Sequence, residues 1–328
     1  MPLPFILAGV ALAAAGYGVK KGIDALDADC EADEFIKKAE NLKEKAKRKV
    51  DSAQSSCNQA LVRLGKKKLH VLSHSVSNFL DHFHRLNRSR IIIEGINMQD
   101  IQRQVSDARN LLNQLNANGI DGDSAPGVIA GFGSLGISSF TTGAILGGGL
   151  AASGLAGMAV IGGIVAGPAL AIFGALSADE MEKKRDDAKA YLSQVETAVK
   201  KADVIVDNLQ AVRKVVDLFT RQITKCDTLF FSLFQGAIAT MKKHHYDTSL
   251  YNQKEKDQLC VTVSTLSSLS AFLKVPIMDK HQKLNKKAQN ALNLMRKQMD
   301  SLENGNYSLS GIRFRQVQLE DLRDDKTS

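Results

Sequence analysis

The sequence has no tryptophan and few aromatic residues, prolines or cysteines. Aromatic side chains make up 5% of the 328 residues, with five prolines and four cysteines. The cysteines at positions 30, 57, 226 and 260 match neither a disulfide framework nor a C-x-x-C metal pair. We therefore expect reduced thiols, no metal or other cofactor, and a protein that faces the cytosol.

Strand signals are also scarce. Apolar positions instead recur every three and four residues over long distances, which predicts an all-α protein. The clearest run, from Tyr191 to Leu233, has the spacing of a coiled coil. A second run covers Ala32 to His84, with alanine at four successive heptad positions. We expect an elongated helical bundle or two coiled-coil rods, packed antiparallel because the small alanines let another helix approach closely.

Shorter elements complete the expected fold. Helical periodicity and breaker residues predict further helices over Met98–Leu115, Lys254–Leu273 and Asp279–Leu302. Near the end of the chain, apolar residues at 312, 314 and 317 stand among polar neighbours, which favours a short strand there.

One long stretch differs in composition from the rest. Ser124 to Ala178 holds 14 of the 25 glycines and no charged residue or histidine. Its length exceeds twice the roughly 20 residues of one membrane crossing, and Gly147-Gly148-Gly149 supplies a bend. In water each interior glycine costs a helix about 0.8–1 kcal/mol, whereas hydrocarbon makes the helix nearly obligatory. We expect an apolar helical hairpin in a membrane; the alternative is a hairpin buried between the rods, permanently or in a resting state.

Glycines four residues apart give this stretch flat helix faces that suit self-association. The residues predicted to serve membrane insertion and helix contact are Gly127, Gly131, Gly143, Gly147, Gly163 and Gly167. These spacings predict a homo-oligomer.

The expected segments follow from these patterns. We divide the chain into an apolar N-terminal anchor or arm (1–25), a basic rod with a following helix (26–120), the glycine-rich membrane hairpin (121–178), a coiled-coil rod (179–246), and C-terminal helices with a tail (247–328). The first 19 residues are uncharged and end at Lys20 and Lys21, which fits a membrane anchor, a cleaved signal or a segment buried against the protein's own helices.

The net charge of +8 is concentrated in one region. Between Phe35 and Arg90, 14 basic residues face four acidic ones, a local excess of 10. One interpretation of this basic region is an ordinary solvated helix face; the alternative is electrostatic attraction to anionic lipid. The residues predicted to contact anionic lipid are Lys20, Lys21, Lys66, Lys67 and Lys68. Nucleic acid is not an expected partner, because the basic stretch lacks Tyr, Trp and any recognised nucleic-acid motif.

Catalytic and metal-binding motifs have little support. Gly131 to Gly136 matches G-x-G-x-x-G, yet no acidic residue follows until Asp179, so the dinucleotide interpretation lacks its context. His70 and His74 share a helix face and suggest a metal pair, or simply exposed histidines on a basic helix. We expect no enzyme.

Two long amphipathic helices that enclose Ser124–Ala178, with its core GAILGGGLAASGLAGMAVIGGIVAG, resemble the architecture of bacterial α-helical pore-forming proteins of the cytolysin A and haemolysin B type, and of apolipoprotein L. The resemblance spans the glycine-rich stretch and both flanking rods. It implies a soluble or peripheral form whose hairpin enters a bilayer and then oligomerises.

The sequence thus predicts a membrane-inserting protein that permeabilises or remodels a bilayer. Its expected location is the cytoplasmic side of a membrane, the bacterial inner membrane first, with a soluble resting form as an alternative. A different function is also open: a membrane-anchored scaffold or adaptor whose rods bind a protein partner, such as a membrane-acting GTPase.

Overall fold

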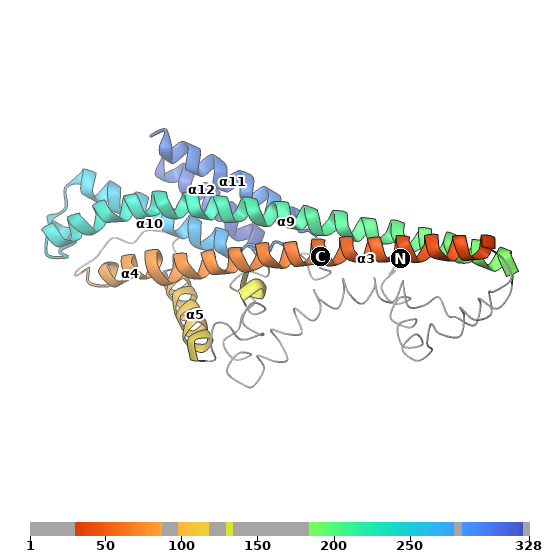
Figure 1. Ribbon diagram of the computed structural model, residues 1–328. Coiled ribbons are helices and arrows are strands. Elements are labelled where there is room, and N and C mark those ends of the chain that lie inside the picture. The colour runs from red at the N-terminus through yellow and green to blue at the C-terminus, as the bar shows by residue number, and fades with distance from the viewer. Residues whose placement is uncertain (1–29, 87–97, 118–128, 134–183, 279–283, 324–328) are drawn as a thin grey trace. The chain divides into compact units, whose positions relative to one another are not determined.

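The computed structural model describes residues 30–86, 98–117, 129–133, 184–278 and 284–323. Across these ranges the chain is mostly helical, and Met278 and Leu284 form an isolated antiparallel bridge. The all-α prediction is confirmed for this part of the chain (Figure 1). The helices are α3 (Cys30–His70), the π-helix η1 (Val71–Val76), α4 (Ser77–Phe83), α5 (Met98–Ala117), α9 (Lys184–Lys243), the 3-10 turn η5 (Thr248–Leu250), α10 (Gln253–Lys274), α11 (Lys286–Glu303) and α12 (Leu309–Arg323).

The chain divides into two compact units, and both long helices contribute to each of them. The first unit takes residues 1–58 and 156–211, and so holds the beginning of α3 and the beginning of α9. The second takes residues 59–155 and 212–328, and so holds the rest of these two helices and all the shorter ones.

In the first unit, α3 and α9 pack through a small apolar seam. Ala39 is fully buried between Leu192 and Val195, and Phe35, Leu42 and Val199 pack around that cluster. The Lys189 ammonium lies 5.8 Å from the centre of the Phe35 ring. The alanine at this heptad position lets the two helices come close, as the sequence pattern predicts.

The direction of this pairing differs from the prediction. Lys49 pairs with Asp203 at 3.1 Å, and in the second unit Arg63 pairs with Asp217 at 3.2 Å. In the first unit Ala39 packs against Val195 ahead of the Lys49–Asp203 pair, and in the second unit Lys67 pairs with Asp227 beyond the Arg63–Asp217 pair. Within each unit the contacts advance in the same direction along both helices, so α3 and α9 run parallel there and the antiparallel prediction is wrong. Antiparallel packing is the rule for helices joined by a short loop, whereas here the whole glycine-rich stretch lies between the two helices.

In the second unit, α10 is the central helix. All residues from Val261 to Val275 are buried, so this part of the helix is covered on all sides. Helix α12 packs on α10 and α11, and α5 also contacts α10. Surface helices bury only one stripe, and burial around the full circumference marks a core helix.

The buried α10 carries many hydroxyl groups, and its ends are fixed by polar contacts. Asn252 caps its first turn in a capping box with Glu255, whose pKa is lowered to about 2 chiefly by hydrogen bonds from Lys243 and His244. At the other end the Lys274 ammonium pairs with Asp100 of α5. Two hydroxyls within the helix bond back one turn: Thr262 donates to the Gln258 carbonyl at 2.8 Å and Ser268 to the Ser264 carbonyl at 3.1 Å.

The predicted helix boundaries hold within a few residues for α5 and α10, but the strand prediction for the tail is wrong. Residues 312–317 lie in α12, where Ile312, Gln316 and Leu319 are buried at helical spacing. Phe314 is 66% exposed and Val317 54% exposed. The apolar residues at 312, 314 and 317 therefore belong to a helix: Ile312 lies on its buried stripe, and Phe314 and Val317 lie on its surface. Together they resemble the two-residue period of a strand.

Aromatic rings form the contact between α4 and α9 in the second unit. Phe79 lies 5.7 Å from Phe230 and 6.3 Å from Phe234, measured between ring centroids, and Phe230 and Phe234 are 5.2 Å apart. All three side chains are fully buried. Edge-to-face and tilted rings at these separations add to the stability that burial itself provides.

This cluster predicts a large difference between two adjacent phenylalanines. Phe230→Ala removes a fully buried ring and should lower the free energy of unfolding by about 3–5 kcal/mol. Phe231→Ala, at a side chain that is 50% exposed, is the matched control and should cost well under half of that. Urea denaturation of both variants measures the difference, and equal losses would contradict the described packing.

Candidate functional site

Residues 129–133 belong to the glycine-rich stretch and are helical and buried in the second unit. Ile129, Ala130 and Phe132 are between 1% and 4% exposed, and Gly131 and Gly133 are also buried. These residues also hold the first two glycines of the G-x-G-x-x-G match. A dinucleotide fingerprint needs a preceding strand, and the described part of the chain contains no strand. We call residues 129–133 the docked segment.

The docked segment lies against α3, main chain to main chain. A methyl group added at Gly65 would lie 2.0 Å from the Ile129 carbonyl oxygen, far inside contact distance. A methyl group added at Gly133 would lie 2.6 Å from the Leu61 carbonyl oxygen and 3.0 Å from the Gly65 nitrogen. The two glycines therefore face each other across a contact that leaves no room for a Cβ atom, as in close helix packing through small residues.

Lys68 closes the same contact from one turn further along α3. Its side chain is fully buried, and its Nζ donates a hydrogen bond of 2.9 Å to the Gly133 carbonyl oxygen. Burial lowers the pKa of this ammonium group from 10.5 to about 7. A lysine with no solvent contact is rare unless it is paired, so this contact is unusual as well as tight.

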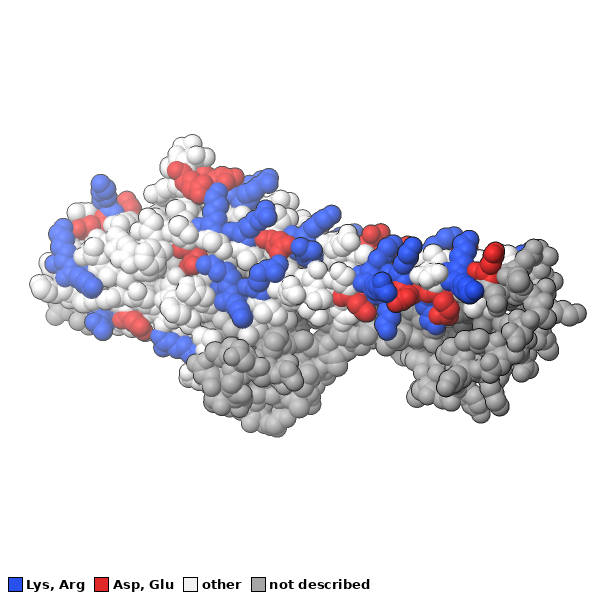
Figure 2. All heavy atoms as spheres, in the orientation of Figure 1, with Lys and Arg blue, Asp and Glu red and all other residues white. Residues whose placement is uncertain are grey.

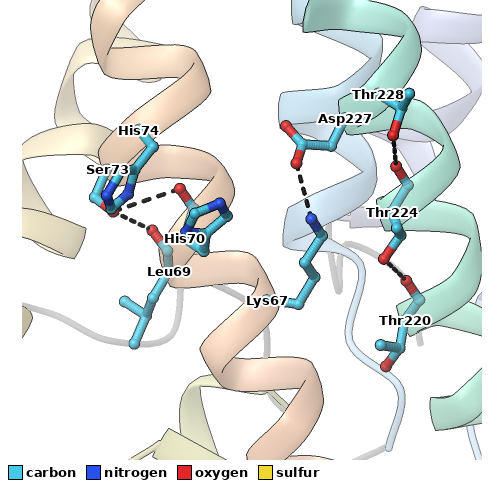
Figure 3. Close-up of polar contacts among 9 residues, drawn as sticks. All are labelled: Lys67, Leu69, His70, Ser73, His74, Thr220, Thr224, Asp227 and Thr228. Atoms are coloured by element: carbon cyan, nitrogen blue, oxygen red, sulfur yellow. Dashed lines mark hydrogen bonds and ion pairs between the residues drawn. The ribbon is translucent and has the colours of Figure 1, made fainter.

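The three consecutive lysines of α3 therefore have three different environments. Lys66 is exposed, whereas Lys67 donates to Asp227 of α9 at 2.8 Å in a largely covered pair, drawn in Figure 3. Beside Asp227, three threonines of α9 bond back to carbonyls one turn earlier: Thr220, Thr224 and Thr228. Of the lysines predicted to contact anionic lipid in this run, only Lys66 presents its ammonium group to solvent in this state.

The histidines predicted as a possible metal pair stack on each other instead. The rings of His70 and His74 are 4.4 Å apart, and His74 Nδ1 is 2.9 Å from the Ser73 hydroxyl (Figure 3). They line an open cavity of about 740 Å³ at the π-helix η1, together with Asp81, Arg109, Asp227 and other residues of the second unit. Among the residues that the structure describes, no three metal-ligating side chains are grouped to hold an ion.

The basic excess of α3 is offset by its neighbours. On the face drawn in Figure 2, Lys and Arg are interleaved with Asp and Glu. Lys49 and Arg63 each reach an aspartate of α9, and Arg48 pairs with Glu44 of its own helix at 2.5 Å. The charge count over Phe35–Arg90 missed the two pairs with α9, because Asp203 and Asp217 lie outside that range.

The remaining predicted site residues lie outside the described residues. These are Gly127, Gly143, Gly147, Gly163 and Gly167 in the glycine-rich stretch, and Lys20 and Lys21 near the start of the chain. Of the helices in the described ranges, none is both long and apolar enough to cross a bilayer.

Sequence reasoning missed Gly65, although a signal for it was present. Gly65 lies in the interior of a predicted rod, where glycine costs about 1 kcal/mol relative to alanine. An isolated glycine inside a helical pattern indicates a close approach by another part of the chain. The segment that contacts Gly65 could not be predicted, because nothing in the sequence of residues 129–133 distinguishes them from the rest of the glycine-rich stretch.

The glycine contact predicts that a single methyl group undocks residues 129–133. Gly65→Ala places a Cβ against main-chain atoms that cannot move aside, and should weaken docking by about 1–3 kcal/mol or more. Hydrogen exchange of residues 129–133 should accelerate correspondingly, about 5- to 150-fold. Gly236→Ala is the control, since its methyl would meet only the flexible end of Gln258. Unchanged exchange in Gly65→Ala would contradict the contact.

No protein-family description, curated protein sequence or solved structure matches the chain.

Proposed function

We propose that the protein permeabilises or remodels a lipid bilayer by inserting its glycine-rich stretch, Ser124–Ala178, which then self-associates through its glycine faces. The observation that carries the proposal is the docked segment: the described part of this stretch is held inside a helical unit by a main-chain contact. The described part of the stretch, residues 129–133, thus starts from a buried position in the second unit.

The energetics of glycine support a change of environment rather than a permanent core. A helix with many glycines is poor in water, where each glycine costs about 0.8–1 kcal/mol relative to alanine. In hydrocarbon the main chain must satisfy its own hydrogen bonds, and close glycine contacts between helices replace hydrophobic packing. The glycine surfaces that dock on Gly65 are therefore of the same kind as those that would join copies in a membrane.

The charges on the described surface do not favour a strong electrostatic attraction to lipid. The basic residues of α3 are interleaved with carboxylates, and Lys67 and Lys68 are engaged within the second unit. Anionic lipid attracts basic residues by about 1 kcal/mol each only when they lie near the surface. Binding to a bilayer in this proposal therefore derives mainly from the apolar stretch.

Dye release from liposomes that contain anionic lipid tests the proposal. Wild-type protein should release the trapped dye, and Gly147→Leu with Gly163→Leu should abolish or strongly reduce release, because leucine separates helices that meet at glycine. Gly148→Leu with Gly162→Leu is the matched control, since neither glycine has another four residues away, and it should keep most of the release.

Two results would count against the pore. Wild-type protein that floats with liposomes and releases no dye would favour the scaffold function instead. Equal loss of release in both double variants would mean that bulk in the stretch, and not the glycine faces, determines the activity.

A further inference from the structure

We propose that Lys68 keeps the docked segment releasable: it holds residues 129–133 through the Gly133 carbonyl while its buried ammonium group opposes that same docking. This inference concerns the regulation of the proposed membrane activity and rests on it. The residue would thereby set how readily the glycine-rich stretch leaves the second unit.

Among the described residues, Lys68 has one neutral hydrogen-bond partner, and its side chain is closed to solvent. Its side chain has no exposed surface, and its Nζ donates a hydrogen bond of 2.9 Å to the main-chain carbonyl of Gly133. A carbonyl neutralises no charge, so a protonated amine at this position is desolvated without a counter-ion. The docked state is stable only if the other contacts outweigh this cost or the amine gives up its proton.

Among the described residues, no ion pair with Lys68 relieves this cost. The docked segment contains no titratable side chain, and on α3 the neighbouring Lys66 is exposed while Lys67 binds Asp227 of α9. On η1, His74 is exposed, as is His70 at the end of α3. On α5, Arg109 reaches Ser77 and Asp81. Accordingly, burial is the cause of the lowered pKa of Lys68, with no contribution from a charge.

The lowered pKa fixes the direction of the pH dependence. The released amine has a pKa near 10.5 and the docked amine about 7, so the released state binds more protons between these values. Docking therefore strengthens about tenfold for each pH unit from about 7.5 to 10, and is weakest and nearly constant below about 6.5. Release is favoured at neutral and acidic pH, and alkaline pH opposes it.

Hydrogen exchange of residues 129–133 in the full chain tests this without a membrane. The measured quantity is the protection factor, the exchange rate of an unstructured peptide divided by the observed rate at the same pH. Wild-type protection should rise about tenfold per pH unit between 7.5 and 9.5. Lys68→Met should raise protection at pH 7 by at least about tenfold, even though it loses the hydrogen bond to Gly133. Its protection should not change with pH.

Two further variants make the result specific. Lys66→Met, the same substitution at an exposed neighbour, should behave like wild type. Lys68→Arg, whose guanidinium stays charged throughout this range, should show weak docking that does not vary with pH. Unchanged protection of α10 amides verifies that each variant is folded.

The outcomes separate this inference from the proposed function. A wild-type protection factor that is flat from pH 7.5 to 9.5, or a loss of protection in Lys68→Met at pH 7, would overturn the role of Lys68, whatever the liposomes do. The expected protection pattern without any dye release would support the role of Lys68 as a docking residue and overturn the membrane activity.

Discussion

Gly65 brings the main chain of residues 129–133 against the main chain of α3, at a distance that no other residue type at this position permits. This contact is the constraint on which the candidate site depends. It fixes Gly133 beneath Lys68, which in turn buries a lysine in an environment that disfavours its charge. The docked segment thus combines close packing, which favours docking, with an uncompensated amine, which opposes it.

The rest of the second unit provides a stable surface for that contact. Helix α10 is enclosed on all sides from Val261 onward, and the rings of Phe79, Phe230 and Phe234 join α4 to α9. The Lys67–Asp227 pair ties α3 to α9 next to the docked segment. The docked segment contributes one buried ring, Phe132, whereas Phe79, Phe230 and Phe234 lie in other helices. The segment can then leave while the main aromatic cluster stays packed.

Much of the fold could be predicted from periodicity, because long helices repeat their apolar positions many times. The heptads over Tyr191–Leu233 predicted helix α9, and the regularly spaced alanines of the first rod predicted helix α3. The parallel direction of their pairing could not be predicted, since seven-residue patterns describe a seam and not the sense of the partner. The tail helix α12 was mistaken for a strand because three apolar positions are too few to distinguish the two periods. The candidate site was harder still: the sequence shows three similar lysines at 66–68, and only the tertiary contacts separate an exposed one, a paired one and a buried one.

The depth of the glycine-rich stretch in a bilayer is the most direct test of the account. A fluorophore attached to Cys in place of Ser138, in a background without the natural cysteines, would be read with lipids that carry a quencher in their acyl chains. The account predicts strong quenching when liposomes are added at pH 7, and weaker or slower quenching at pH 9. Dye release without any quenching at this position would contradict it, because the membrane would then be breached by another part of the chain.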